Sequence, residues 1–229
     1  MRALLVLFLA ATAVYAAKAP NPLASSLVSS DEVRIRRSPT KLEEFVGHVR
    51  YRARSNLMQA DWALYDHADQ RWSARGNVLT EHRFLNGDRL QIKGDRVVYD
   101  MVSERGELFG PKGKPVALTR IGEDGLRDFG AAERLEWEGK NRLALVGETH
   151  FWGAKLESWS DRADLKPARK TLELTGGRPV LRNFEGSWIG AIKAEQITAL
   201  DDPRRIKADG KVRGWIEFKK KKTNETGSR

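Results

Sequence analysis

The sequence of 229 residues predicts an all-β protein, a jelly-roll-like or solenoid-like stack of antiparallel strands. Two observations lead to this prediction. Apolar and polar residues alternate with period two in successive segments, and a recurring pair of an acidic residue and a glycine divides the chain into similar units. In addition, no segment after residue 17 shows a helical period over ten residues. A chain of this length can bury the core of one large domain or two small ones.

The first 16 residues have the layout of a secretory signal peptide. Arg2 supplies a positive charge, an apolar stretch covers residues 3–17, and small residues around Ala16 suit cleavage there. This stretch is shorter than the roughly 20 apolar residues of a membrane span, so a retained anchor is the weaker alternative. The expected organisation is a signal peptide over 1–16, a linker over 17–30, a repeat domain over 31–218 and a basic disordered tail over 219–229.

Composition narrows the compartment and the partners. The sequence contains no cysteine, which excludes a lipid-modified cysteine, disulfides and thiolate metal sites, and an exported chain of this kind fits a bacterial envelope. The formal charge is +10, and removal of residues 1–16 leaves +9 because Arg2 is the charged residue lost. Basic charge favours a polyanionic partner, and outside the cytoplasm phosphorylated lipids and membrane surfaces are more available than nucleic acid. Alternatively, the interspersed charge only keeps a β protein soluble.

An acidic residue is followed by a glycine 14 or 15 positions later in several places. The pairs are Asp61 with Gly76, Asp95 with Gly110, Glu133 with Gly147, Asp161 with Gly176 and Glu195 with Gly210, with Glu32 and Gly47 as a looser sixth. A glycine in a strand tolerates a bend or bulge that other residues resist, so each glycine is expected to bend its strand. Because the acids recur in every unit, we interpret them as structural turn or edge residues, since catalytic carboxylates are not expected to repeat.

Within each unit, the second and fourth residues after the acid are apolar, and their neighbours are mostly polar after the first unit. This alternation predicts a strand with one buried face. The same alternation precedes most of the glycines, and short polar segments between the two strands have the chemistry of hairpin turns. Further strands are expected at 90–93, 116–120 and 189–193.

The stretch LQIKGDRVVYD at 90–100 is the most specific piece of the sequence, because Gly94 and Asp95 are followed by an apolar strand ending near Tyr99. With the repeated spacing, it resembles the OstA-like, or LptA-type, family of lipopolysaccharide export proteins, which includes the periplasmic domain of LptC. The resemblance covers most of 45–218 and, more weakly, 30–44. It implies a twisted, partly open β-jelly roll with an apolar groove, stacked edge to edge with similar domains so that acyl chains slide along the shared groove. The chain is longer, with more repeats, than the usual bridge subunit of that family.

The inward-facing apolar residues have two interpretations. They either close on one another as a dry sandwich core, as alternating apolar positions mostly do, or line a groove for acyl chains as the resemblance implies. Tryptophan and tyrosine, with an apolar body and a polar tip, suit the mouth of such a groove. The groove candidates are Tyr65, Trp72, Val97, Tyr99, Leu108, Leu135, Trp137, Leu143, Leu145, Leu165, Leu172, Leu174 and Ile197.

The resemblance implies lipopolysaccharide or a related anionic lipid as ligand. Other β-jelly-roll transport subunits, or a second copy of the chain, are the expected protein partners, and no nucleic acid is expected. Pairing is expected through unpaired edge strands near 45–51 and 212–218, because an open strand edge accepts a further strand.

Catalysis finds little support in the sequence. The four histidines lack metal-ligand spacing, the serine in the stretch 186–190 is not in a nucleophile elbow, and no phosphate-binding loop is present. We therefore expect a non-enzymatic protein without cofactor or metal that takes part in lipopolysaccharide transport to the outer membrane. The expected location is the periplasm, at the inner membrane if the N-terminal segment is retained. Two alternatives stay open: a ligand-free structural or adhesive β-repeat protein of the cell envelope, and a polyanion-binding module.

Overall fold

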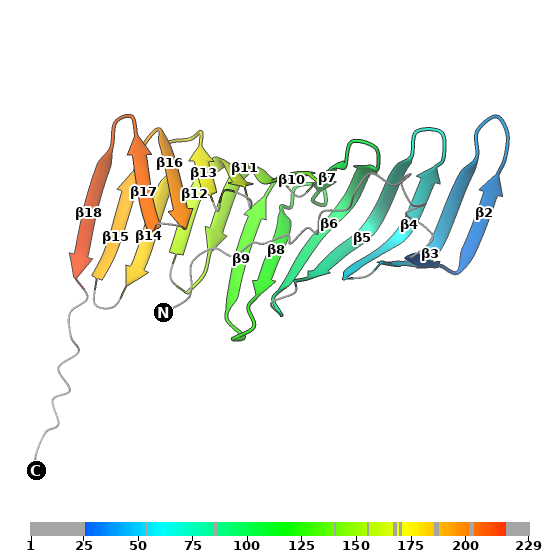
Figure 1. Cartoon of the computed structure of the whole chain (residues 1–229), viewed down its shortest axis with the longest axis horizontal. Coiled ribbons are helices and arrows are strands. Elements are labelled where there is room, and N and C mark those ends of the chain that lie inside the picture. The colour runs from blue at the N-terminus through cyan, green and yellow to red at the C-terminus, as the bar shows by residue number, and fades with distance from the viewer. Residues whose placement is uncertain are drawn as a thin grey trace, which may run out of the picture.

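The computed structural model describes residues 26–53, 55–84, 87–139, 141–154, 156–166, 169, 171–185, 188–201 and 204–218. These residues form eighteen strands and no α-helix, and every strand pair is antiparallel, which confirms the all-β prediction. The strands follow one another along the long axis of the molecule, from β2 at one end to β18 at the other (Figure 1). The predicted signal peptide and basic tail lie outside the described residues.

Strands occur at the alternating segments on both sides of the repeated acids and glycines. They are β1 (Ser26–Ser29), β2 (Glu32–Arg36), β3 (Leu42–Ala53), β4 (Asn56–Asp66), β5 (Arg71–Arg83), β6 (Arg89–Asp100), β7 (Arg105–Phe109), β8 (Val116–Ile121), β9 (Arg127–Ala132), β10 (Arg134–Glu138), β11 (Arg142–Trp152), β12 (Leu156–Lys166), β13 (Thr171–Thr175), β14 (Val180–Glu185), β15 (Trp188–Lys193), β16 (Gln196–Asp201), β17 (Arg204–Asp209) and β18 (Arg213–Phe218). The additional strands expected at 90–93, 116–120 and 189–193 are confirmed as parts of β6, β8 and β15.

The continuous sheet is folded into two facing layers. Six long strands, β3, β4, β5, β6, β11 and β12, contribute one half to each layer, and in several of them the register shifts at the midpoint, as between Val46 and Val49 in β3. The first layer has the order β2-β3-β4-β5-β6-β7-β10-β11-β12-β13-β16-β17. The second layer has the order β1-β3-β4-β5-β6-β8-β9-β11-β12-β14-β15-β18.

The acid–glycine pairs lie along the line where the two layers meet, which we call the corner. Gly76 has φ +75° and the next residue, Asn77, has φ +48°, so two consecutive residues in the left-handed region bend the strand. A Cβ on Gly76 would lie 2.5 Å from Oδ2 of Asp61, and Asn77 Nδ2 donates to that oxygen at 2.8 Å. At another corner the backbone N–H of Glu133 donates to the Gly147 carbonyl at 3.0 Å. The structural interpretation of these acids and glycines is therefore confirmed.

Two units depart from the expected pairing. Glu32 lies on β2 opposite Val46, and the acid of that corner is Asp31, whose N–H donates to the Gly47 carbonyl at 3.0 Å. Spacing alone selected Glu32 in place of Asp31. The two acids are adjacent in the sequence, and only the carboxylate of Asp31 lies over Gly47 at the corner. Gly110 also lacks the bulge, since the chain leaves β7 there and passes to β8.

Every connection between the two layers runs along the corner. The links β1–β2, β7–β8, β9–β10, β13–β14, β15–β16 and β17–β18 pass from one layer to the other there, and the remaining links join neighbouring strands of a single layer. Among the described strands, no backbone ladder joins the layers along the opposite side, which we call the mouth. Side-chain packing therefore holds the mouth closed.

The edges of the layers differ in part from expectation. Residues 45–51 were expected to form an unpaired edge, but β3 pairs with β4 on one side and with β1 and β2 on the other. β1 falls in the segment 17–30 that was expected to be a linker, so the folded region begins before residue 31. The edge expected at 212–218 is confirmed as β18, and in the described residues β1, β2, β17 and β18 each pair on one side only.

Candidate functional site

The first layer presents two continuous rows of side chains to the second layer. Residues directly opposite each other on paired strands share a face, so the register defines both rows. The inner row, beside the corner, consists of Phe45, Ala63, Ala74, Val97, Leu108, Leu135, Leu145, Ala163, Leu174, Ile197 and Ala208. The mouth row consists of Tyr65, Trp72, Tyr99, Gly106, Trp137, Leu143, Leu165, Leu172, Ala199 and Ile206.

The structure places all thirteen groove candidates in these two rows. Each is either buried or packed against the buried core. They come from nine strands that are separated by up to about 130 residues in the chain, yet the register aligns them on one face. The prediction that they share an interior is therefore right. Contact between any of them and an acyl chain stays a prediction.

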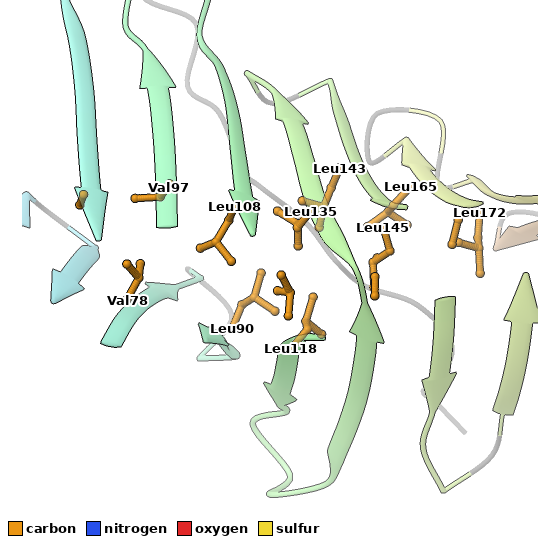
Figure 2. Close-up of a cluster of buried hydrophobic side chains, with 14 of the residues drawn as sticks. Val78, Leu90, Val97, Leu108, Leu118, Leu135, Leu143, Leu145, Leu165 and Leu172 are labelled. Atoms are coloured by element: carbon orange, nitrogen blue, oxygen red, sulfur yellow. The ribbon is translucent and has the colours of Figure 1, made fainter. Parts of the chain in front are cut away.

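The second layer supplies the other wall of the interior, which the sequence analysis missed. Figure 2 shows Val78, Leu90 and Leu118 facing Val97, Leu108 and Leu135 across the gap between the layers. The missed residues that are buried are Val49, Ala60, Val78, Phe84, Leu90, Val116, Leu118, Ala132, Leu156, Leu181 and Ala194. A signal was present at the corners, because Val49 and Val78 each stand two positions after the glycine of a bent strand.

The inner row forms a dry core. Leu108, Leu135 and Leu174 are each 1% exposed, and Ile197 is 0% exposed. Each such side chain contributes about 2 kcal/mol to folding through burial. For the inner row this burial favours the sandwich-core interpretation.

The mouth row is less completely covered in its middle. Tyr99 and Trp137 are half-buried, and their rings stack with centroids 5.9 Å apart. Gly106 lies between them in the row, and a Cβ there would fall on the Trp137 ring, so only glycine leaves room for the indole. Burial raises the pKa of the Tyr99 hydroxyl, with nearby carboxylates acting in the same direction, so the phenol stays uncharged at neutral pH.

Toward β2, an aromatic cluster closes the mouth. Trp72 stacks on Tyr65 with centroids 4.9 Å apart and on Phe45 at 5.9 Å. Tyr51 reaches Trp72 from the second layer, at 5.8 Å between ring centroids, so this contact spans the mouth. Aromatic pairs of this kind contribute about 1 kcal/mol each beyond burial. The closure is therefore made of contacts that can separate without loss of a backbone hydrogen bond.

The apolar interior is exposed at both ends of the molecule. Val33 on β2 continues the inner row and is 52% exposed. Ile35 on β2 is 55% exposed and lies opposite Glu43, which separates it from Tyr65 at the end of the mouth row. At the other end, Ile206 on β17 continues the mouth row, and Ile216 on β18 lies on the interior face of the second layer. Exposed apolar groups gathered at two edges mark surfaces that another molecule can cover.

An ion cluster lies on the mouth side of the second layer. Arg120 donates to Asp88 at 2.7 Å and to Asp128 at 3.1 Å, and Asp88 is 3% exposed. Burial raises the pKa of Asp128, with the Arg120 guanidinium opposing this effect. The Arg120 guanidinium therefore links the carboxylates of Asp88 and Asp128.

A hollow of about 550 Å³ lies on the outer face of the first layer. Cross-strand neighbours of alternating charge, Arg71, Asp100, Arg105, Glu138 and Arg142, form one row of its lining. Because this hollow is lined mainly by charged side chains and lies outside the layers, it is not the apolar groove that the resemblance implies.

The histidines are dispersed over the fold. His48, His67, His82 and His150 bond to Asp31, Glu43, Asn56 and Glu157 respectively, at separate positions. Within the described ranges, no group of three or more histidine, aspartate or glutamate side chains could hold a metal ion. The described part of the chain also has no helix of the length and apolarity needed to cross a membrane. The serine of 186–190 lies outside the described residues, and the absence of enzymatic activity stays a prediction.

Comparison with known proteins finds a likeness in structure and none in sequence. No protein-family model matches the chain, and no curated protein matches its sequence. Among solved structures, the chain is similar to LptH of Pseudomonas aeruginosa, the LptA-homologous periplasmic component of the lipopolysaccharide transport device. The likeness covers 69% of this chain and 87% of LptH, at 12% identity and a TM-score of 0.32. At that TM-score, the similarity by itself assigns neither fold nor function.

Proposed function

We propose that the chain is an exported lipid-binding protein that takes part in lipopolysaccharide transport to the outer membrane, with acyl chains entering between the two layers. The observation that carries the proposal is the continuous apolar interior whose mouth is closed by side chains alone. Acyl chains that displace the mouth-row side chains break no backbone ladder, and they replace apolar contacts with apolar contacts. The cost of opening is therefore small compared with unfolding.

The proposal includes assembly end to end with similar subunits or with a second copy. β1 and β2 at one end, and β17 and β18 at the other, offer unpaired backbone groups beside exposed apolar side chains such as Ile35 and Ile206. Strand addition at such an edge would continue both layers and the interior between them. The periplasm is the location that this function requires.

Photo-crosslinking in Gram-negative cells tests the lipid contact. A photoreactive residue replaces Tyr99 or Trp137 in the mouth row, and matched controls replace Val98 or Glu138, the next positions along the same strands, which face outward. Adducts with lipopolysaccharide are expected at the two mouth positions and not at the outer ones. Native mass spectrometry of the purified chain, with and without added lipid, is expected to show bound lipid.

A ligand-free structural β-repeat protein is the second candidate, and the dry packing of the inner row favours it. Leu135 is 1% exposed and Ile197 is 0% exposed, which leaves almost no surface for a ligand in this state. The two candidates predict different outcomes. Absence of lipid adducts at both mouth positions, together with a mass spectrum without bound lipid, would refute the transport proposal and favour the ligand-free structural protein.

A further inference from the structure

The outer face of the second layer carries a second apolar surface, distinct from the interior. Phe151, Leu181 and Ile192 point between the layers, so the residues next to them in β11, β14 and β15 point outward. Outward positions in a two-layer protein are ordinarily polar. The surface, called here the outer aromatic face, consists of Phe129, His150, Trp152, Trp159, Val180, Ile189, Ala191 and Trp215.

Ring stacking makes this face continuous across three strands. Phe129 on β9 stacks on Trp152 of β11 with centroids 5.6 Å apart, and Trp152 stacks on His150 at 4.4 Å. His150 in turn stacks on Trp159 of β12 at 5.0 Å. Trp215 on the edge strand β18 lies on the same face and is 48% exposed. None of these rings contributes to the interior, so their clustering outside it calls for a partner.

Two basic side chains, Lys193 and Arg213, lie on the same face as the rings. Lys193 on β15 lies directly opposite Arg213 on β18, and like charges in directly opposed cross-strand positions destabilise a sheet. Neither side chain forms an ion pair with any other residue that the structure describes. Glu157 on the same face is already bonded to His150 at 3.1 Å and to Arg182 at 3.2 Å. Glu217, two rows away, is the other acid near this surface.

We propose that the outer aromatic face docks on the surface of a membrane that contains anionic lipids. Indole rings favour the headgroup region because one end is apolar and the other polar, and lysine and arginine are attracted to an anionic leaflet. The repulsive pair Lys193 and Arg213 is relieved when lipid phosphates lie over it. The face is independent of the interior, so the chain would deliver or receive lipid while lying against a bilayer through a surface that the lipid-transport proposal does not use.

Vesicle flotation with the purified chain tests this docking. The vesicles are phosphatidylcholine with or without phosphatidylglycerol, and the key variant is Lys193→Ser with Arg213→Ser. A cation near an anionic leaflet contributes about five-fold in affinity, so this double variant is expected to bind phosphatidylglycerol vesicles roughly 30-fold more weakly. The matched control is Arg75→Ser with Arg96→Ser, which removes the same charge from the outer face of the first layer. The control is expected to lose less than about three-fold.

Trp215→Ser tests the aromatic part of the face separately. Because Trp215 is exposed on an edge strand, its substitution does not disturb the core. It is expected to weaken vesicle binding about ten-fold, because interfacial binding scales with the apolar area that is buried in the lipid. Absence of wild-type binding to anionic vesicles overturns the inference, as does equal loss in the two double variants. Capture of a protein in place of vesicles overturns it in favour of a protein partner. Bound lipid in native mass spectra of Lys193→Ser with Arg213→Ser is expected to equal the wild type, which separates docking from interior lipid binding.

Discussion

The substitution Gly106→Ala tests how the middle of the mouth is packed. Trp137 lies directly opposite Gly106, and the position of an added Cβ coincides with the edge of the indole ring. The ring is in the mouth row and stacks on Tyr99, so it has to swing out of the row to make room. Because Gly106 has no positive φ, the cost comes from this steric conflict rather than from backbone strain.

The expected destabilisation follows from two contributions. Overpacking of a well-packed site costs about 1 to 3 kcal/mol. Loss of the Tyr99–Trp137 stack adds about 1 kcal/mol. The free energy of unfolding is therefore expected to fall by about 2 to 4 kcal/mol, measured by urea denaturation with linear extrapolation.

Gly214→Ala is the matched control, because the nearest atom to an added Cβ there is the Ala191 carbonyl oxygen at 3.7 Å, an ordinary contact. It is expected to change stability by less than about 0.5 kcal/mol or to raise it slightly through the unfolded state. In a Trp137→Ala background, Gly106→Ala is expected to cost less than about 1 kcal/mol, because the two sites are coupled. A wild-type urea midpoint for Gly106→Ala, or an equal cost in both backgrounds, would refute the reasoning.

Two further predictions concern the corner and the ion pairs that Arg142 and Arg162 form with Asp164. Gly147→Ala places a Cβ at φ +80° against the Glu133 carboxylate and is expected to lower the free energy of unfolding by about 3 kcal/mol. The control Gly113→Ala, at φ +72° in open space, carries only the backbone cost of about 1 to 2 kcal/mol. Equal urea midpoints of the two variants would contradict this expectation. The pKa of Asp164 is lowered from 3.8, because hydrogen bonds from arginines on β11 and β12 outweigh the opposing effect of burial. Its contribution to stability is present above pH about 3.8 and lost as pH falls through the lowered pKa, so Asp164→Asn is expected to reduce stability at neutral pH and to flatten its decline below pH about 4. The measurement is the thermal unfolding midpoint of the wild type and of Asp164→Asn as a function of pH. Parallel curves for the two proteins would contradict this prediction.

Local pattern was enough to predict the strand faces and the bends. Val97 and Tyr99 alternate with charged or polar neighbours, and this period places both on one face whatever they pack against. The glycines of the repeat were identified by spacing, and Gly76 takes the left-handed conformation that only a glycine adopts cheaply. Both features depend on a few consecutive residues, so a single sequence contains them.

Pairing partners were not predictable in the same way. The alternation in residues 45–51 fits an edge strand and an interior strand equally well. These residues are interior because β1, with four residues, and β2, with five, pair with opposite halves of β3. The choice between Asp31 and Glu32 at the first corner likewise depends on which carboxylate reaches Gly47 in space.

The sequence by itself determined that the chain is all β, where most of its bent strands bend, and which thirteen apolar side chains share the interior of the first layer. Only the tertiary structure decided that the two halves of each long strand face one another, that the mouth is closed without backbone ladders, and that His150 and Trp152 gather outside the core. The physical reason is that alternation defines two faces of a strand from local geometry, whereas the covering of either face depends on ladders between residues far apart in the chain. In β11, where Phe151 points inward between two outward aromatic residues, both faces are apolar and only the pairing distinguishes them.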